Sequence, residues 1–283
     1  MLKRLFACVV TLALGIGSHA VADDDSLSLV VMDPLAAPLS CPCVEGYAQR
    51  KYEVLASHLE TSIGRKVKLT FSESLKAALE KTDGHVDIVI GKQSVVAADL
   101  AAAKRKGRAV FRLTDQKGST EQYGMIVVNK DDPAKNVKDL AGYTIIFGPS
   151  EAEEKSSAAF SILKNAGITI PTDRRKVDEA CSDGACKVID LGPKSKTAAV
   201  ISSYAQPLLE GCGTIKKGDL RVVVKTDPVP FITVFATDSV NKAEYKMISE
   251  SLAEVSSKPA VLESLESLVG FVQIADAKAA KKK

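Results

Sequence analysis

The sequence predicts an α/β protein with two lobes, in which each lobe is a mostly parallel sheet flanked by helices. Three observations lead to this expectation. Strand-type apolar segments alternate with helical segments in the first third of the chain, and the alternation resumes after residue 137. The chain crosses between the two stretches near Gln122 and near Pro228, which suggests two lobes with a hinge.

The first half reads as strand, helix, strand, helix, strand. Contiguous or alternating apolar residues predict strands over residues 27–32, 67–71, 86–91 and 109–113. Apolar residues at helical spacing predict helices over residues 46–64, 75–79 and 95–106. This order is typical of a right-handed unit with parallel strands, and its ligand crevice should lie beyond the carboxyl ends of those strands.

The second half repeats the alternation without repeating the sequence. Strands are predicted over residues 122–129, 144–147, 187–191, 198–204, 220–224 and 231–237. A short helical turn is expected over residues 137–140, and helical segments over residues 153–166, 208–211, 242–256 and 260–269. The predicted domains are therefore residues 23–122 plus 228–283 for lobe 1 and residues 123–227 for lobe 2.

The N-terminus has the pattern of a secretory signal peptide. Lys3 and Arg4 precede an apolar run over residues 5–16, and Ala20-Val21-Ala22 forms a cleavage site. The run is too short to span a bilayer. Residues 1–22 are thus predicted to be removed, which leaves an exported protein without a membrane anchor.

Charge and composition narrow the function classes. Without residues 1–22, which contain two basic residues and no acidic one, the 38 Lys and Arg become 36 against 35 Asp and Glu, a formal charge of +1. This balance argues against a nucleic-acid binder, which needs a basic face. The chain has no Trp, so a stacking platform for sugars or bases is not expected.

Five cysteines remain in the predicted mature chain. Cys181 and Cys186 enclose a polar segment with a glycine, so we predict a disulfide between them in an oxidising compartment. Cys41-Pro42-Cys43 is less regular, because a bridge between cysteines two residues apart is strained. It could be a soft-metal site or a redox thiol pair, or one of its thiols could pair elsewhere, with Cys212 as a candidate. We therefore predict no metal site.

The stretch around the strand 144–147 carries the strongest functional signal. This buried strand enters a helix through Gly148-Pro149-Ser150. Unpaired N–H groups and the positive end of the helix dipole favour an anion at such a helix start, near Ser150, Ser156 and Ser157. The alternative stays open that Ser150 is only an N-cap, with Glu153 completing a capping box.

Several segments match one known family. They are the helix at residues 47–59, Gly84-x-Val86-Asp87-Ile88, Tyr123-Gly124-x-Ile126-Val127-Val128, Asp139-Leu140-x-Gly142-x-Thr144-Ile145-x-Phe147, Ala198-Ala199-Val200 and Val229-Pro230. Through them nearly the whole mature chain resembles the substrate-binding proteins of phosphate/phosphonate-type ABC importers. The resemblance implies the two-lobed type II periplasmic-binding-protein fold, a periplasmic location, a monomer, and delivery of a small anion to an ABC permease.

The resemblance also places the ligand between the lobes, on loops and helix N-termini. The residues at matching positions are Ser40, Lys92, Gln93, Ser94, Thr120, Tyr123, Ser150, Lys155, Ser156, Ser157, Ser202, Ser203 and Tyr204. Each could equally be an ordinary turn or capping residue. Phosphonate binders of the family carry a Ser-x-Ser-Gly-like turn after the strand 144–147, where this chain has three glutamates (151, 153, 154). Their charge opposes a phosphonate unless Lys155 or Lys92 offsets it.

The leading prediction is a non-enzymatic exported protein, without a cofactor, that closes two lobes around a small oxyanion. An alternative keeps the fold but makes the chain an accessory protein of an exported redox or metal system, with Cys41 and Cys43 as its thiol or metal site. Catalysis is not predicted, because the sequence has no G-x-S-x-G, H-E-x-x-H, P-loop or dinucleotide motif.

Overall fold

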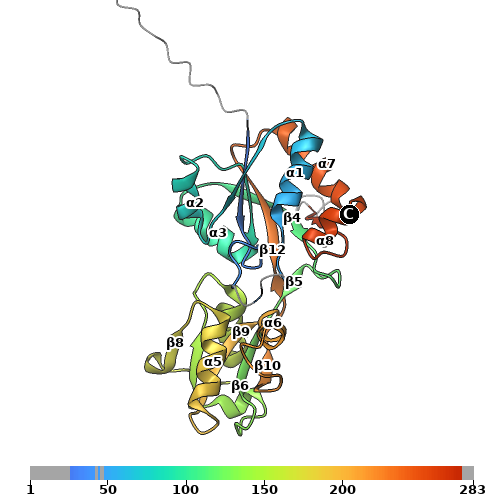
Figure 1. Ribbon diagram of the computed structural model, residues 1–283. Coiled ribbons are helices and arrows are strands. Elements are labelled where there is room, and N and C mark those ends of the chain that lie inside the picture. Colours follow the sequence, from blue (N-terminus) through green and yellow to red (C-terminus); the bar gives the residue numbers. More distant parts are fainter. Residues whose placement is uncertain (1–25, 42–43, 45–47, 276–283) are drawn as a thin grey trace, which may run out of the picture.

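The computed structural model describes residues 26–41, 44 and 48–275, which form two α/β lobes joined by crossing segments (Figure 1). The predicted signal peptide and Cys43 lie outside the described residues. In the described part of the chain, no helix combines the length and the apolar character that a membrane span requires.

The first lobe is built on a six-stranded sheet with the order β13-β4-β12-β3-β1-β2. Its strands are β1 (Leu27–Met32), β2 (Val67–Phe71), β3 (Ile88–Lys92), β4 (Gly107–Leu113), β12 (Ile232–Thr237) and β13 (Phe271–Gln273). The flanking helices are α1 (Tyr52–Ile63), α2 (Leu75–Lys81), α3 (Gln93–Ala102), α7 (Lys242–Glu254) and α8 (Pro259–Ser264). Figure 1 shows α2 and α3 on one face of this sheet and α1, α7 and α8 on the other.

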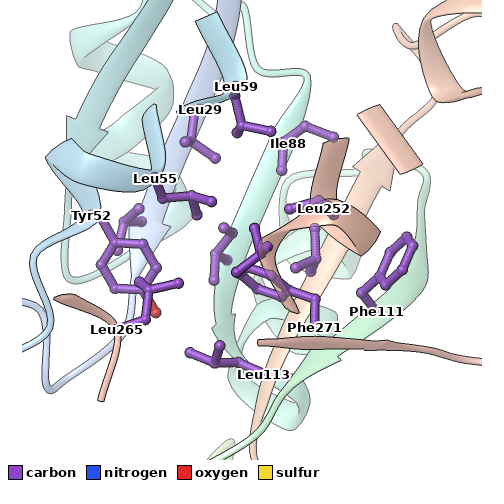
Figure 2. Packing of buried hydrophobic residues seen from close by; sticks show 14 of the residues in the cluster. Leu29, Tyr52, Leu55, Leu59, Ile88, Phe111, Leu113, Leu252, Leu265 and Phe271 are labelled. Carbon is purple, nitrogen blue, oxygen red and sulfur yellow. The ribbon is translucent and has the colours of Figure 1, made fainter. Parts of the chain in front are cut away.

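The main core of the first lobe lies between its sheet and α1, α7 and α8 (Figure 2). Leu29 and Ile88 from the sheet meet Leu55 and Leu59 of α1, and all four side chains are at most 2% exposed. Alternation along the strands sends neighbouring side chains such as Val30 and Val89 to the opposite face, where they pack against α2 and α3. Burial of both faces explains why β1 and β3 are nearly continuous apolar runs.

The second lobe is built on a five-stranded sheet with the order β10-β6-β9-β7-β8. Its strands are β6 (Gly124–Asn129), β7 (Thr144–Phe147), β8 (Arg175–Val177), β9 (Thr197–Ser202) and β10 (Leu220–Lys225). Its helices are α4 (Ser157–Asn165), α5 (Cys181–Leu191) and α6 (Ala205–Gly211). Apolar residues of α4 pack on one face of the sheet, and those of α5 and α6 pack on the other.

Short elements complete the chain. The crossing segments between the lobes form a two-stranded antiparallel sheet, β5 (Glu121–Gln122) with β11 (Val229–Pro230). Single 3-10 turns are η2 (Val137–Leu140), η3 (Glu153–Lys155), η4 (Thr172–Arg174) and η5 (Val255–Ser257). The turn η3, between β7 and α4, is the one that matters for the site.

The predicted two-lobed α/β class with helix-flanked sheets is confirmed, with one correction to the pairing. Parallel pairs join β1 to β2 and β3, and β7 to β8 and β9. The strands that return across each sheet, β12 and β6 among them, pair antiparallel with their neighbours. Both sheets are therefore mixed, because the chain passes between the lobes in both directions and inserts a return strand into each.

The prediction of a strand at residues 187–191 is wrong, because these residues belong to α5. Buried Ala185 and Val188 of α5 lie three residues apart on one face, which is helical spacing. A short apolar run cannot by itself distinguish a strand from a buried helix.

The predicted Cys181–Cys186 disulfide is wrong for the same reason, and neither thiol is bridged. Five residues along a helix rise about 7.5 Å and turn by about 140°, so the two side chains diverge. Disulfide geometry needs closer Cα atoms and converging Cβ atoms.

Candidate functional site

A cavity of about 460 Å³ is lined by residues of both lobes. The first lobe contributes the loop after β1 and the carboxyl ends of β1 and β3. The second lobe contributes the loop before α4 and the N-terminal parts of α5 and α6. Parallel strands bring their carboxyl ends to one edge of the sheet, so this is where an open α/β fold places a ligand.

One wall of this cavity is apolar. Leu35 and Leu39 of the loop after β1 and Leu208 and Leu209 of α6 all line it. The loop is fixed from beneath by Asp33, which is fully buried and accepts hydrogen bonds from Arg50 Nη1 (2.8 Å) and Tyr52 Oη (2.6 Å). Asp33 Oδ1 also accepts the Leu35 N–H at 2.9 Å. This buried network gives the apolar wall a defined position.

A buried ion pair joins the lobes beside the cavity. Lys92, the last residue of β3, places its Nζ 2.5 Å from Oε1 of Glu154 in η3. Ser202, the last residue of β9, donates from its Oγ to the same carboxylate oxygen at 2.7 Å. Glu154 is fully buried, and its Oε2 has no hydrogen-bond partner within the described residues. Lys92 thus offsets the charge of one of the three glutamates, Glu154.

Protonation states follow from this pairing. Burial opposes ionisation of Glu154, but the Lys92 charge and the bonds from Lys92 and Ser202 outweigh it, so the pKa of Glu154 lies below its ordinary value. Burial likewise disfavours a charged Lys92, yet Tyr204 and Glu154 raise the pKa of Lys92. Burial, opposed by Lys92, raises the pKa of Tyr204 to about 12. The pair is therefore ionised and the phenol neutral at neutral pH.

Tyr204 connects this pair to the core of the first lobe. Its ring lies 5.4 Å from Lys92 Nζ and stacks on Phe231 with centroids 5.3 Å apart. The Arg50 guanidinium in turn lies over the Phe231 ring at 5.5 Å. Tyr204 is the N-cap residue of α6 and also lines the cavity. The floor of the cavity is thus continuous with the Asp33–Arg50 network.

Two groups could receive an anion in this cavity. The helix α5 begins beside it at Cys181 and Ser182, and the preceding Ala180 supplies no side-chain cap. The first backbone N–H groups of a helix lack intrahelical partners. Lys155 also lines the cavity and donates one hydrogen bond, 2.7 Å, to the Glu179 carbonyl, which leaves two further ammonium hydrogens.

Three carboxylates form an acidic rim around the cavity. Glu73, Glu151 and Glu179 line it and are exposed, so solvent and salt screen their charge. Lys92 and Lys155 are the cationic lining residues, and the buried Glu154 balances the charge of Lys92, so the three exposed carboxylates outweigh Lys155 by two charges. A compact, highly charged anion is therefore less suited to this cavity than one with an apolar part.

Four of the predicted site residues line the cavity, namely Ser40, Lys92, Lys155 and Tyr204. Ser202 does not line it, but it contacts Glu154 and Lys92 and also Cys181, whose Sγ lies 3.6 Å from Ser202 Oγ. Other predicted residues bond elsewhere: Ser94 Oγ donates to the Glu151 carbonyl at 2.6 Å, and Ser203 Oγ accepts the Tyr123 N–H at 3.4 Å. The carbonyl of Thr120 accepts the Phe231 N–H, and Gln93 lies near Arg112 and Thr233.

The segment around Ser150 does not have the N-cap that the sequence left open as an alternative. Ser150 Oγ donates to Glu151 Oε2 at 3.1 Å, and neither an N-cap at Ser150 nor a capping box with Glu153 forms. Instead the turn η3 precedes α4, whose N-cap is Ser156 without a side-chain cap. Ser156 Oγ is engaged with the carbonyls of Ser150 and Ala152, and Ser157 is exposed. The Ser156 hydroxyl at the start of α4 is thus engaged by the preceding turn.

Three residues of the site were not among the predicted ligand-binding residues, namely Glu154, Cys181 and Ser182. A glutamate near a helix start is usually a solvated residue, and its partner Lys92 is 62 positions away in the sequence. The start of α5 was obscured by the expected cysteine loop.

The possible metal site at Cys41 and Cys43 is only partly described. Cys41 lines the cavity, but Cys43 is outside the described residues. Among the residues described, no group of three or more His, Cys, Asp or Glu could hold a metal ion.

Comparisons with known proteins agree with this architecture. Residues 46–279 match the family model described as "ABC transporter, phosphonate, periplasmic substrate-binding protein". No curated protein matches the sequence.

Solved structures show the same fold at low sequence identity. The binding-protein component of an ABC phosphonate transporter from Pseudomonas aeruginosa has 14% identity and a TM-score of 0.67, with 90% of this chain and 83% of that chain covered. PhnD1 from Prochlorococcus marinus, solved with methylphosphonate, has 14% identity and a TM-score of 0.61, with 92% and 97% covered. A Xanthomonas citri protein solved with chloride has 16% identity and a TM-score of 0.65, with 91% and 94% covered.

Proposed function

The chain belongs to the family of periplasmic substrate-binding proteins of phosphonate ABC transporters, and from this premise we propose that it captures a phosphonate-like oxyanion between its lobes for an ABC permease. The observation that carries the proposal is the cavity between the lobes, where the start of α5 and Lys155 lie beside an apolar wall. A helix N-terminus and an ammonium group both favour a negatively charged ligand.

The lining favours an organic oxyanion over an inorganic one. Leu35, Leu39, Leu208 and Leu209 offer apolar surface that phosphate or sulfate cannot use. Burying one methylene contributes about 0.8 kcal/mol, which is roughly a fourfold gain in affinity. In a series from methyl- to butylphosphonate, affinity should therefore rise stepwise until the cavity is filled.

The proposal also includes the location of the protein, its oligomeric state and the boundaries of its lobes. Cleavage after Ala22 would release a monomeric, non-enzymatic receptor into the periplasm. Lobe 1 comprises residues 23–122 plus 228–283, and lobe 2 comprises residues 123–227. The paired crossing strands β5 and β11 support a hinge at this boundary, because they are the short segments that connect the two larger sheets.

Thermal unfolding of the mature protein (residues 23–283) tests the ligand class. The panel contains phosphate, sulfate, phosphite, the alkylphosphonates and alkylsulfonates. A ligand that binds only the folded state adds about 2.7 kcal/mol at a hundredfold excess over its dissociation constant. For a protein of this size that is a rise of roughly 5–10 °C in Tm. A panel without any shift would contradict the proposal.

Ser182 allows a test of the location. A carboxylate at position 182, the second residue of α5, favours the helix dipole but repels an anion in the cavity. Ser182→Asp should therefore keep or raise the intrinsic Tm and lose the ligand-induced shift. The matched control Ser182→Asn, which adds a similar volume without charge, should keep most of that shift. Equal shifts in both variants would place the ligand elsewhere.

A further inference from the structure

Glu154 occupies a place where donors from both lobes converge. Lys92 Nζ and Ser202 Oγ lie 2.5 Å and 2.7 Å from the same oxygen, Glu154 Oε1. These donors stand at the carboxyl ends of β3 and β9, in the two different sheets. An ammonium and a hydroxyl at converging strand ends are the groups that would bind a free oxyanion.

The turn that carries Glu154 is built into the fold. A Cβ at Gly124 would lie 1.9 Å from the carbonyl oxygen of Glu154, and a Cβ at Gly148 would lie 2.5 Å from Lys155 Cε. Glycine at both positions thus makes room for η3. From the first lobe, Ser94 Oγ also accepts the Glu153 N–H at 3.3 Å. The carboxylate is held in place by backbone packing on several sides, not by the ion pair alone.

The position of the pair relative to the cavity separates two subsites. Lys92 and Lys155 line the cavity, whereas Glu154 and Ser202 do not, so the carboxylate lies behind the cavity wall. An ionised Glu154 cancels the charge of Lys92 and fills the space that an oxyanion would need to reach it. A ligand in the cavity can then use Lys155 and the start of α5 but not Lys92.

We propose that Glu154 is a tethered carboxylate that occupies an inner anion subsite formed by Lys92 and Ser202, and that removing its side chain opens this subsite to free oxyanions. The inference goes beyond the proposed function, because it concerns a subsite that the chain itself fills. It does not depend on which ligand the outer cavity takes.

Chemical rescue tests the inference. Glu154→Ala removes both the charge and the volume of the carboxylate and leaves Lys92 buried and unpaired, so Tm should fall. Acetate, sulfate or methylphosphonate should then raise the Tm of this variant by about 5–10 °C at a hundredfold excess over the dissociation constant. Chloride at equal ionic strength should do much less.

Three further variants test whether any rescue comes from an anion bound at Lys92 in the vacated space. Glu154→Gln removes the charge but leaves the space filled, so acetate should not rescue it. Lys92→Met/Glu154→Ala lacks the cation and should show no rescue. Glu153→Ala, in the same turn but half-buried, controls for changes to η3. If the double variant folds while Glu154→Ala stays unfolded in all three anions, the inference is overturned.

The inference is likewise overturned if Glu154→Ala gains no more from the anions than Glu153→Ala does. Rescue that persists in Lys92→Met/Glu154→Ala would also overturn it, because the anion would then bind away from Lys92. The oxyanion panel on the wild-type protein tests the proposed function separately. A wild-type protein that binds no oxyanion, beside a rescued Glu154→Ala, would contradict only the proposed function.

Discussion

Lys92 at the end of β3 and Glu154 in η3 form a buried ion pair, 2.5 Å between Nζ and Oε1, that connects the two lobes. A pair of this kind contributes modestly to net stability, because burying both charges costs nearly as much as their attraction returns. In the proposed binding mode the pair also leaves Lys155, and not Lys92, as the cation open to an anion.

Removing one partner of the pair should destabilise the protein strongly. Lys92→Met leaves a buried, uncompensated carboxylate, and we expect the free energy of unfolding to fall by about 3–5 kcal/mol. Lys92→Met/Glu154→Gln removes both charges and should recover most of the loss. Urea unfolding of the wild type, the two single variants and the double variant at pH 7 measures the coupling. Additive losses would show that the two side chains do not interact.

The acid dependence of stability should reflect Glu154. Its folded pKa lies below the ordinary value of 4.5, so the pair stabilises the fold fully above that value and less as the pH falls through the folded pKa. Urea unfolding between pH 7 and pH 3 should show a difference between wild type and Glu154→Gln that shrinks below about pH 4.5.

A second carboxylate contributes to the same acid dependence. Hydrogen bonds from the Lys135 and Asn136 backbone N–H groups lower the pKa of exposed Asp139. Asp139→Asn should therefore remove part of the acid dependence but leave the Glu154 difference intact. A difference between wild type and Glu154→Gln that stays constant from pH 7 to pH 3 would contradict the assigned ionisation.

Gly124 should not tolerate a side chain. Its added Cβ would lie 1.9 Å from the Glu154 carbonyl oxygen, which is backbone and cannot move aside cheaply. Gly124→Ala should cost about 1–3 kcal/mol or more, as overpacking does elsewhere, and should loosen the Lys92–Glu154 pair. The control is Gly184→Ala, because Gly184 lies inside α5 and its added Cβ would lie 3.2 Å from Ala199 Cβ. The higher helix propensity of alanine offsets part of the strain from that contact. Comparable losses in Tm would contradict this account of Gly124.

The thiols of α5 should behave as free cysteines. The protein is alkylated and digested without prior reduction. Mass spectrometry should then find both thiols alkylated, with no disulfide between Cys181 and Cys186. Burial and the neighbouring Asp190 and Asp183 raise the pKa of Cys186, so iodoacetamide should modify it more slowly at pH 8 than it modifies glutathione. A Cys181–Cys186 linked peptide would require α5 to unwind at its start.

Much of the fold could be predicted from the sequence because local pattern and burial agree there. β1 and β3 are buried on both faces, so their apolar runs are unambiguous, and β7 is bounded by Gly142 and Gly148. The start of α5 was not predicted, because the spacing of Cys181 and Cys186 suggested a loop and not a helix. The short strands β8 and β13 carry too few apolar residues to stand out from the segments around them.

The candidate site was only partly predictable, for a physical reason. Lys92 could be placed in the cleft because it follows a buried strand, whose carboxyl end faces the crevice. The burial of Glu154 depends on the close approach of η3 to Gly124 and on a lysine from the other lobe, and neither leaves a local signal. Long-range packing of this kind is decided by the tertiary structure.

The most direct test of the central claim is a crystal structure of the mature protein with the oxyanion that gives the largest shift in Tm. We predict that the anionic group lies in the cavity, within hydrogen-bond distance of Lys155 Nζ and the first N–H groups of α5. Its apolar part should contact Leu35 and Leu208, and the Lys92–Glu154 pair should be intact. Density for the ligand outside the cavity between the lobes would contradict the claim.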